Sequence, residues 1–463
     1  MSLIVRTMTA PCEHKELISS IIIHLASSGY EPLIACAKQQ FLSVFGKNVS
    51  MEAILQDMQP GSPVPTFDSD HVLRLSSVIY NADQGLLSGD LFCSPNGNGF
   101  LYLRLARSPH FSITITVDGK TVQVLQLEIG YLGDRVEVEC LSNFAELIEE
   151  TLTNQGKKVE WSLVRPSNSL FNDLIHSDET QFVTGDTISR EDAELAGKLE
   201  DQVTREVAIA VKRAGGMHVE DVGKKVAKQE DADKVSKELV HANLITREFV
   251  IICRKTSKQI NRMTSRDAID KMTEAGVLCS CGSPIADERI EELFLPTPVL
   301  DKLLKQSYWT TARLVYILRQ LGIHDNSILL NLHDGPEEVD SFIDMDGAFL
   351  MLELKDGEFS MGHAYKFGSR IGLYNPHYAI IVSTKGVAPE VKNHFAKAKP
   401  QSTLVYVDKM SQLTSSLEDI LKDVHSKRAV QVLADLDSVT IPLLPVLAAK
   451  IGFRLSNRQE IIV

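Results

Sequence analysis

The 463-residue sequence predicts a multidomain α+β and α/β protein with three structured regions: an N-terminal α+β module, a central segment of three helices followed by a β-wing, and a C-terminal α/β/α domain. Length is the first observation, because about 100–200 residues per domain gives about three domains. Composition is the second: 44% hydrophobic and 24% charged residues are ordinary for globular proteins and exclude global disorder. The third is the change between helical and strand-like periodicity along the chain.

Residues 1–170 are expected to form the N-terminal α+β domain. Helical periodicity runs over residues 15–45, and apolar and polar residues alternate over residues 111–117, as in a half-buried strand. The pair Asp118-Gly119 directly after that strand is a strong hairpin signal. No catalytic constellation is found in this domain, and the sequence does not define its role. It is expected to act as a sensor or as an assembly surface for partner proteins.

A polar, acidic stretch at residues 171–200 predicts a linker with some helix, and residues 201–265 follow with a compact pattern of helices and strands. The helices are expected over residues 203–214, 219–226 and 231–242, and a strand pair over residues 244–253. Three helices followed by a β-wing resemble a winged helix-turn-helix, a fold that often binds DNA. Winged helices also serve as dimerisation or spacer modules, and the sequence leaves that alternative open.

Charge supports the DNA-binding interpretation for the central segment alone. The whole chain has a net charge of −13, but residues 1–200 carry 14 basic and 26 acidic residues, whereas residues 201–265 carry 13 basic and 9 acidic ones. The expected nucleic-acid contacts lie on the third helix and on the wing. They are Lys234, Lys237, Arg247, Arg254 and Lys255.

Seven cysteines, an odd number without repeated spacing, indicate a reducing compartment and mostly buried thiols. No secretory signal is visible, and the most apolar N-terminal stretch, residues 17–26, is much shorter than the ~20 residues of a membrane span. The sequence therefore predicts a cytoplasmic protein without membrane association.

Residues 266–299 are expected to be a helical connector that carries Cys279-Ser-Cys281-Gly282. A structural zinc site usually needs four ligands, typically from two paired sets. Among the cysteines, only Cys253 lies within reach in the sequence and no second pair exists. The sequence thus favours buried or incidental thiols over zinc.

Residues 300–463 carry the strongest chemical signal. The pattern predicts a long helix over residues 301–321, strands over residues 327–332, 338–343, 348–355, 378–384 and 403–407, and a helix over residues 389–397. The strand at 348–355 is apolar except for Glu353 and Lys355, which are two residues apart and so point to the same face. Asp340 lies in the preceding hairpin strand, where the turn can place it beside Glu353.

Two carboxylates beside a lysine form an oxygen-rich site suited to Mg²⁺ (or Mn²⁺). Such a metal can polarise a phosphodiester oxygen and activate an attacking water, while the lysine positions that water and balances charge. The neighbouring acidic residues are expected to lie in turns and in solvent. These are Asp344, Asp346, Asp356 and Glu358.

Asp340, twelve intervening residues and then Glu353-x-Lys355 resemble the motif of the PD-(D/E)xK nuclease superfamily, whose fold is called restriction endonuclease-like. The resemblance covers about the last 165 residues of the chain. It implies that Asp340, Glu353 and the carbonyl of Leu354 bind the metal and that Lys355 activates water. His363 and Tyr365 are candidates for substrate contact. Many members have an acidic residue in the first helix, whereas residues 308–319 of this chain include Arg313 and no Asp or Glu. The sequence therefore leaves open whether the site binds one metal or two.

The expected function is that of a magnesium-dependent endonuclease acting on DNA in restriction, defence or repair. By analogy with the family, paired nicking of the two strands of a duplex would favour a homodimer of this chain. The alternative is a non-catalytic DNA-binding or regulatory protein with a degenerate nuclease-like domain. A third interpretation is an interaction module in a defence or repair assembly. The sequence contains no Gly-rich phosphate loop ending in Lys-Ser or Lys-Thr, so an ATP motor would have to be another chain.

Overall fold

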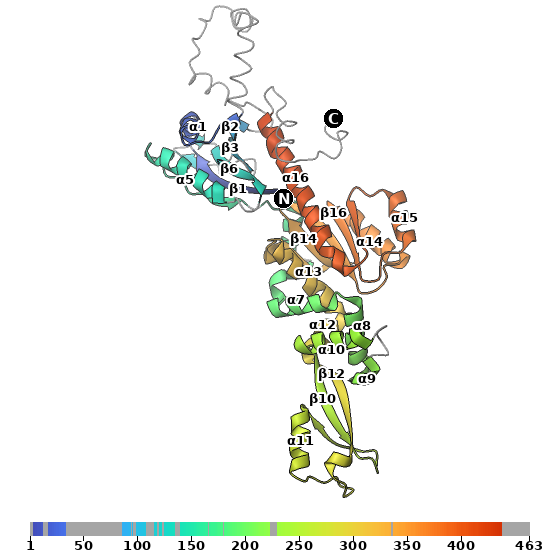
Figure 1. Cartoon of the computed structure of the whole chain (residues 1–463). Coiled ribbons are helices and arrows are strands. Elements are labelled where there is room, and N and C mark those ends of the chain that lie inside the picture. Colours follow the sequence, from blue (N-terminus) through green and yellow to red (C-terminus); the bar gives the residue numbers. More distant parts are fainter. Residues whose placement is uncertain are drawn as a thin grey trace, which may run out of the picture. The chain divides into compact units, whose positions relative to one another are not determined.

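The computed structural model places the chain in two compact units, residues 1–166 with 420–463 and residues 167–419. The residues described here are 3–12, 17–33, 86–93, 95, 99–107, 115–117, 120–122, 125–134, 139–164, 166–178, 180–222, 229–334 and 337–437. The structure therefore contains several sheets and helices, as expected of a multidomain α+β protein (Figure 1). Among the described residues, no helix has both the length and the apolar character needed to cross a membrane.

The first unit contains a five-stranded antiparallel sheet in the order β2-β3-β6-β1-β7. Its strands are β1 (Leu3–Cys12), β2 (Leu86–Cys93), β3 (Gly99–Arg107), β6 (Leu125–Asp134) and β7 (Ser162–Val164). The helices α1 (Leu17–Ser27) and α5 (Glu139–Thr153) pack on this sheet through one shared apolar core. A small hairpin, β4 (Ile115–Val117) with β5 (Lys120–Val122), is present where the sequence predicts one, although its turn residues lie outside the described ranges.

The second unit is built around a six-stranded mixed sheet in the order β17-β16-β15-β14-β13-β8. The strands are β8 (Thr180–Thr184), β13 (Ile328–Asp334), β14 (Glu337–Met345), β15 (Ala348–Lys355), β16 (Tyr378–Ser383) and β17 (Thr403–Val407). Neighbours from β8 to β15 are antiparallel, and β15, β16 and β17 are parallel. Residues 348–352 of β15 and all of β16 are buried on both faces of the sheet, which explains their nearly continuous hydrophobic sequences.

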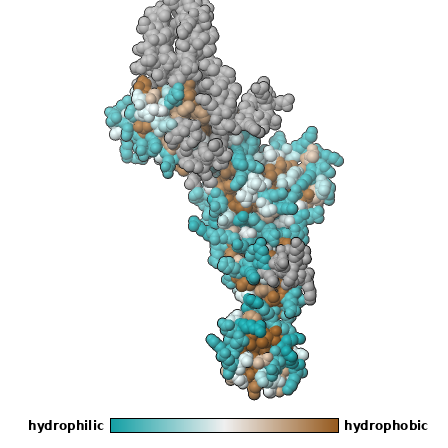
Figure 2. Space-filling view, in the orientation of Figure 1, coloured by the Kyte–Doolittle hydropathy of each residue, from teal (hydrophilic) through white to brown (hydrophobic). Residues whose placement is uncertain are grey.

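Helices cover both faces of this sheet. On one face α14 (Met361–Tyr374), α15 (Pro389–Ala398) and α6 (Ser169–His176) share a core with the sheet through Phe367, Phe395 and Phe171. On the other face α13 (Tyr308–Gln320) contacts β15 and buries Leu314 and Leu318. The outer surface of α14 and α15 is mostly hydrophilic on the face shown in Figure 2, as expected of amphipathic helices that cover a sheet.

The prediction of one continuous helix over residues 301–321 is wrong, because the helix is interrupted. It divides into α12 (Pro298–Leu304) and α13, with a short 3₁₀ turn at residues 305–307 between them. Gln306 and Ser307 have φ values of +49° and +57°. A left-handed backbone at two consecutive residues cannot continue an α-helix. Glutamine and serine are not residue types that indicate such a backbone, so the sequence does not predict the interruption.

Residues 171–200, predicted as a linker, belong to the second unit. They form most of α6, then β8 at the sheet edge, a 3₁₀ turn and α7 (Arg190–Ala196), which packs on α13. At the other end, α16 (Leu413–Asp437) begins in the second unit, and the chain from Ile420 onward groups with the N-terminal residues.

The central segment has three helices, α8 (Gln202–Ala214), α9 (Val219–Val222) and α10 (Gln229–His241). The segment also forms a four-stranded antiparallel sheet in the order β11-β10-β12-β9, in which β9 comes from between α8 and α9. Its strands are β9 (Met217–His218), β10 (Ile245–Ile252), β11 (Gln259–Met263) and β12 (Arg289–Pro296). The helical connector predicted over residues 266–299 contains one helix of nine residues, α11 (Arg266–Glu274), and continues into β12, which pairs with β10 along its whole length.

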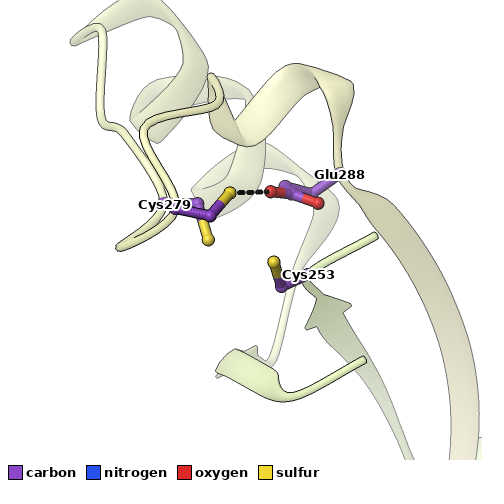
Figure 3. Close-up of side chains that lie close together, drawn as sticks. Cys253, Cys279 and Glu288 are labelled. Carbon is purple, nitrogen blue, oxygen red and sulfur yellow. Dashed lines mark hydrogen bonds between the residues drawn. The ribbon is translucent and has the colours of Figure 1, made fainter. Parts of the chain in front are cut away.

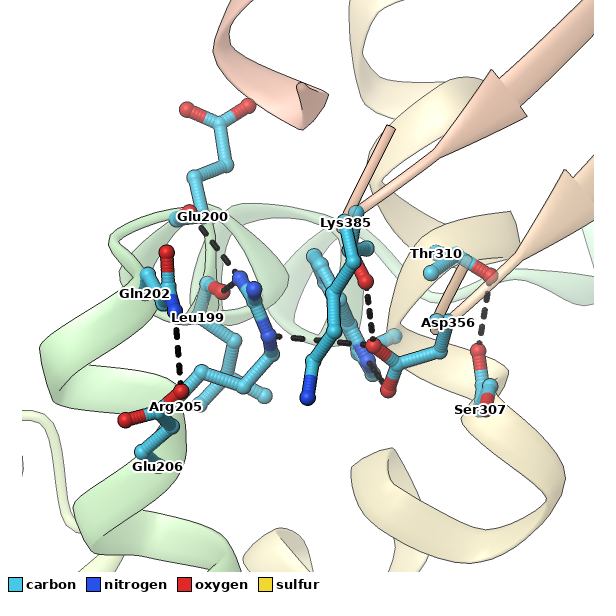
Figure 4. Close-up of polar contacts among 12 residues, drawn as sticks. Leu199, Glu200, Gln202, Arg205, Glu206, Ser307, Thr310, Asp356 and Lys385 are labelled. Carbon is cyan, nitrogen blue, oxygen red and sulfur yellow. Dashed lines mark hydrogen bonds and ion pairs between the residues drawn. The ribbon is translucent and has the colours of Figure 1, made fainter. Parts of the chain in front are cut away.

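A buried arginine joins α8 to the six-stranded sheet within the second unit (Figure 4). Arg205 is 3% exposed and donates to the carbonyls of Leu199 and Glu200 at 2.8 and 3.0 Å. Its guanidinium lies 3.7 Å from the Asp356 carboxylate and stacks on the Trp309 ring. Trp309 also donates from Nε1 to Asp356 at 3.0 Å. The expectation that Asp356 is a solvent residue is therefore wrong, because its carboxylate accepts a hydrogen bond from Trp309 and forms an ion pair with the buried Arg205.

Candidate functional site

The strand register brings together the three residues expected to carry the chemistry. The last recorded pair of β14 and β15 toward this end joins Ser341 to Leu352, so the next pair in register joins Asp340 to Glu353. Residues opposite each other on antiparallel strands point to the same face. Lys355 follows two positions after Glu353 and shares that face. The three side chains therefore converge at one edge of the sheet.

Hydrogen bonds orient both carboxylates. The Leu354 N–H donates to Asp340 Oδ2 at 2.6 Å, which holds Asp340 against the end of β15. Arg370 on α14 donates from Nη1 to Glu353 Oε2 at 2.9 Å, and these two side chains are 11% and 20% exposed. The other oxygens, Asp340 Oδ1 and Glu353 Oε1, bond to no residue within the described ranges. Each carboxylate thus keeps one oxygen available for a ligand.

Burial sets the protonation of this pair. Burial raises the pKa of Asp340 above its ordinary value, and the Leu354 N–H and the positive charge of Arg370 oppose this increase. Burial, together with the negative charge of Asp340, raises the pKa of Glu353 to about 7. Like charges that share a poorly solvated site resist simultaneous ionisation. A divalent cation would remove that conflict by compensating both carboxylates.

The lysine and the histidine of the expected site are also close to it. The side chain of Lys355 forms no hydrogen bond or ion pair with the described residues, which leaves its ammonium group available. His363 lies in the first turn of α14, where its Nδ1 accepts from the Ser360 N–H at 3.2 Å in a capping box. Burial and the positive charges of Lys355 and Lys366 lower the pKa of His363. A neutral His363 therefore lies near Lys355.

Tyr365, the other residue expected to contact substrate, has a different environment. Its side chain is 64% exposed and packs edge-on against His394 of α15, with ring centroids 5.3 Å apart. Among the nearby acidic residues, Asp344 is 5% exposed and accepts from the N–H groups of Asn168 and Gly347, so it is a buried turn residue and not a solvated one. Glu358 is exposed, as expected.

The expected nucleic-acid contacts fall into two groups. Lys234 and Lys237 are exposed and lie three residues apart on α10, beside the start of β10. Arg254 and Lys255 are exposed in the turn after β10. An eight-residue strand spans about 27 Å, so the two groups are far apart. Arg247 is held within the sheet by an ion pair with Glu292.

A third cluster gathers residues that the sequence leaves apart. Cys253, Cys279, Cys281 and Glu288 place one ligand atom each within 4.8 Å of one another. Figure 3 shows the side chains of Cys253, Cys279 and Glu288 directed toward one another from three segments of chain. The cysteines are free thiols. The residue that the sequence interpretation lacked is Glu288, a carboxylate nine residues after Cys279.

No protein-family model matches the chain, and no curated protein is similar to it. Among solved structures, one that is similar is the crystal structure of protein VC1899 from Vibrio cholerae, at 13% sequence identity and a TM-score of 0.32. The match covers 57% of this chain and 64% of that chain. A likeness at this level gives no support to any particular function.

Two site residues are missed by reasoning from sequence. Arg370 follows His363 by seven residues, two helical turns, so the two share one face of α14. That spacing could have suggested Arg370 as a site residue. The signal is weak, because a single arginine on an amphipathic helix is common. Glu288 has no such signal, because its position depends on the pairing of β12 with β10.

Proposed function

We propose that the chain is a metal-dependent endonuclease that hydrolyses DNA phosphodiester bonds at Asp340, Glu353 and Lys355. The observation that carries the proposal is the pair of largely buried carboxylates with raised pKa values beside a lysine without an ion-pair partner in the described chain. Buried carboxylates are costly, and a pair with displaced pKa values is a feature of functional sites more often than of structural ones.

The arrangement of elements around the site supports the same class of protein. The order α13, β13, β14, β15, α14, β16, α15 and β17 fits the resemblance to the restriction endonuclease-like fold. In that resemblance the Glu-x-Lys residues end a central strand, as Glu353 and Lys355 end β15. Because folds host many functions, the chemistry of the site carries more weight than this likeness.

The donor set fits Mg²⁺ or Mn²⁺. Asp340 Oδ1 and Glu353 Oε1 would be its carboxylate ligands, and hard oxygen ligands of this kind are those that Mg²⁺ prefers. The Leu354 carbonyl is adjacent in the chain and would add a third oxygen. When bound, the metal supplies a Lewis acid for the phosphate and lowers the pKa of a water ligand.

The chain's own residues would position the reactants. The Leu354 N–H fixes the Asp340 carboxylate, and Arg370 fixes the Glu353 carboxylate, so neither must reorganise when the substrate binds. The Lys355 ammonium would hold the attacking water and offset negative charge on the phosphate in the transition state. His363, uncharged and near Lys355, would accept or donate a hydrogen bond to the substrate.

The proposed test is nicking of supercoiled plasmid with Mg²⁺ or Mn²⁺. We expect Glu353→Ala and Lys355→Ala each to reduce the rate about 100-fold or more, the range of a lost acid–base or metal-binding group. Glu358→Ala, a change at an exposed carboxylate of the same edge, is the matched control and should cleave normally. If the purified chain cleaves no DNA and no RNA in either metal, the proposal is wrong.

The second candidate is a DNA-binding or regulatory protein with a degenerate site. One observation favours it: Arg370 already compensates Glu353, so the pair is partly satisfied without a metal. This candidate predicts salt-dependent DNA binding without hydrolysis, unchanged by Glu353→Ala and weakened by Lys234→Ala with Lys237→Ala. The two candidates agree on binding and differ on cleavage.

A further inference from the structure

The cysteine cluster lies in a small lobe at the end of the β10–β12 ribbon, which we name the cysteine lobe (residues 253–288). Its chain runs from the turn after β10 through β11, α11 and a second turn to the start of β12. The four residues of the cluster come from both turns and from the start of β12, so they link segments that are far apart in the sequence.

The spacing of the ligand atoms fits one metal ion. A tetrahedral zinc with bonds of about 2.3 Å to sulfur and about 2.0 Å to oxygen has sulfurs about 3.8 Å apart and a sulfur–oxygen edge of about 3.5 Å. Cys281 Sγ lies 3.4 Å from Glu288 Oε1, and all four atoms lie within 4.8 Å of one another. A cluster of several metal ions needs ligands that are farther apart.

The backbone of both turns holds the ligands in place. The Thr256 N–H points to Cys253 Sγ at 3.4 Å, a contact that favours a thiolate. In the second turn the Cys279 N–H donates to the Ser283 carbonyl at 2.8 Å, and Gly282, with φ of +86°, donates back to the Cys279 carbonyl. A left-handed residue there lets two cysteines separated by one residue face the same point.

The buried carboxylate of the cluster lacks a compensating cation among the described residues. Glu288 is 4% exposed, and the Arg254 backbone N–H donates to its Oε2 at 2.6 Å. Yet no arginine, lysine or histidine of the described chain forms an ion pair with Glu288. Cys253 and Cys279 are 2% and 4% exposed. A buried carboxylate that faces three sulfurs without a cation is unfavourable, and a soft divalent metal compensates it.

The lobe is also too small to depend on its apolar core. The lobe contributes four buried side chains to that core, which also contains Phe249 and Ile251 of β10, and two of the four are the cysteines Cys253 and Cys279. Segments below about 40 residues usually need disulfides, metals or a partner to fold stably. A metal bound at the cluster would tie the two turns to β12 and provide that stabilisation.

From these observations we infer that Cys253, Cys279, Cys281 and Glu288 bind one zinc ion, which holds the cysteine lobe together. Three cysteine ligands and one carboxylate complete a closed tetrahedral set without a position for water, as in structural zinc sites. Any thiol that is protonated releases its proton to solvent on binding. The site is separate from Asp340 and Glu353 and does not depend on the proposed nuclease activity.

The test is the zinc content of the purified full chain, measured by plasma mass spectrometry after dialysis against buffer without metals. We expect about one zinc per chain, and at least a tenfold lower content in the double variant Cys279→Ser with Cys281→Ser. Cys140→Ser, at a cysteine outside the cluster, and Glu353→Gln, at the proposed nuclease site, should both retain zinc. Loss of zinc in Glu353→Gln would show that the zinc is bound at the proposed nuclease site and not at the cysteine cluster, and would overturn the inference.

A second measurement does not depend on the variants folding. Replacing zinc by Co²⁺ in the intact chain should give the intense sulfur-to-cobalt absorption of tetrahedral thiolate ligands. Removing zinc with a chelator should speed hydrogen exchange in α11 and leave β15 unchanged, since only α11 belongs to the lobe. A chain without zinc and without this absorption, or an intact mass 2 Da low from a disulfide within the cluster, would show that the cysteines do not bind metal.

Discussion

Replacing Glu353 by glutamine should change how the stability of the second unit depends on pH. Glu353 has an ordinary pKa of 4.5 and a folded-state pKa of about 7. Below pH 4.5 the carboxyl is protonated in both states. As pH rises from 4.5 to 7 the unfolded state loses its proton first, so the free energy of unfolding falls by roughly 3 kcal/mol. Glu353→Gln should remove this fall, because its amide does not titrate.

The assay is urea unfolding between pH 4.5 and pH 8 in buffer freed of magnesium and manganese. The chain has two tryptophans, and Trp161→Phe leaves Trp309, which is buried in the second unit, as the only tryptophan, so that excitation at 295 nm reports on this unit. The slope with pH is compared instead of the absolute stability, because losing the bond to Arg370 changes stability at every pH. Glu358→Gln, at an exposed carboxylate, is the control and should keep the slope of the parent chain.

Adding Mg²⁺ should restore stability at pH 8 in the parent chain and have little effect on Glu353→Gln, because the metal binds the ionised carboxylates. Parallel pH profiles for the parent and Glu353→Gln would refute this reasoning. They would mean that solvent or Arg370 compensates the carboxylate fully, and the electrostatic argument for a metal site would then fail.

The remaining predictions concern three other parts of the second unit. Arg370→Met removes a cation that lowers the pKa of Glu353, so the pH for half-maximal cleavage should move upward in a pH–rate profile. Lys234→Ala with Lys237→Ala should weaken DNA binding for all sequences and reduce the slope of log affinity against log salt by about 1.8, which binding titrations at several salt concentrations would measure. Arg205→Met breaks a buried ion pair and should cost roughly 3–5 kcal/mol in urea unfolding.

The C-terminal strands were predictable because local sequence decides them. Strand β15 begins and ends at the residues expected, since an apolar run bounded by a turn and by charged residues has few alternatives. The pairing of Asp340 with Glu353 follows from the tight turn between β14 and β15, which sets the register. The convergence of Asp340, Glu353 and Lys355 on one face could therefore be predicted from spacing.

Other features depend on contacts between distant residues. The role of Asp356 could not be predicted, because its partners Arg205 and Trp309 lie on two other elements. The same holds for the Cys279 cluster, which forms only when β12 pairs with β10 and brings Glu288 beside the turn. Sequence spacing describes neighbours along one element and says little about such long-range contacts.

The most direct test of the proposed nuclease site is a crystal of the full chain soaked with Mn²⁺ and measured for anomalous scattering. The account predicts one strong peak between Asp340 Oδ1 and Glu353 Oε1, within about 2.2 Å of each, and no peak there in Glu353→Gln. A map without a peak at that position, with Glu353 still bonded to Arg370, would contradict a metal-dependent mechanism at these residues.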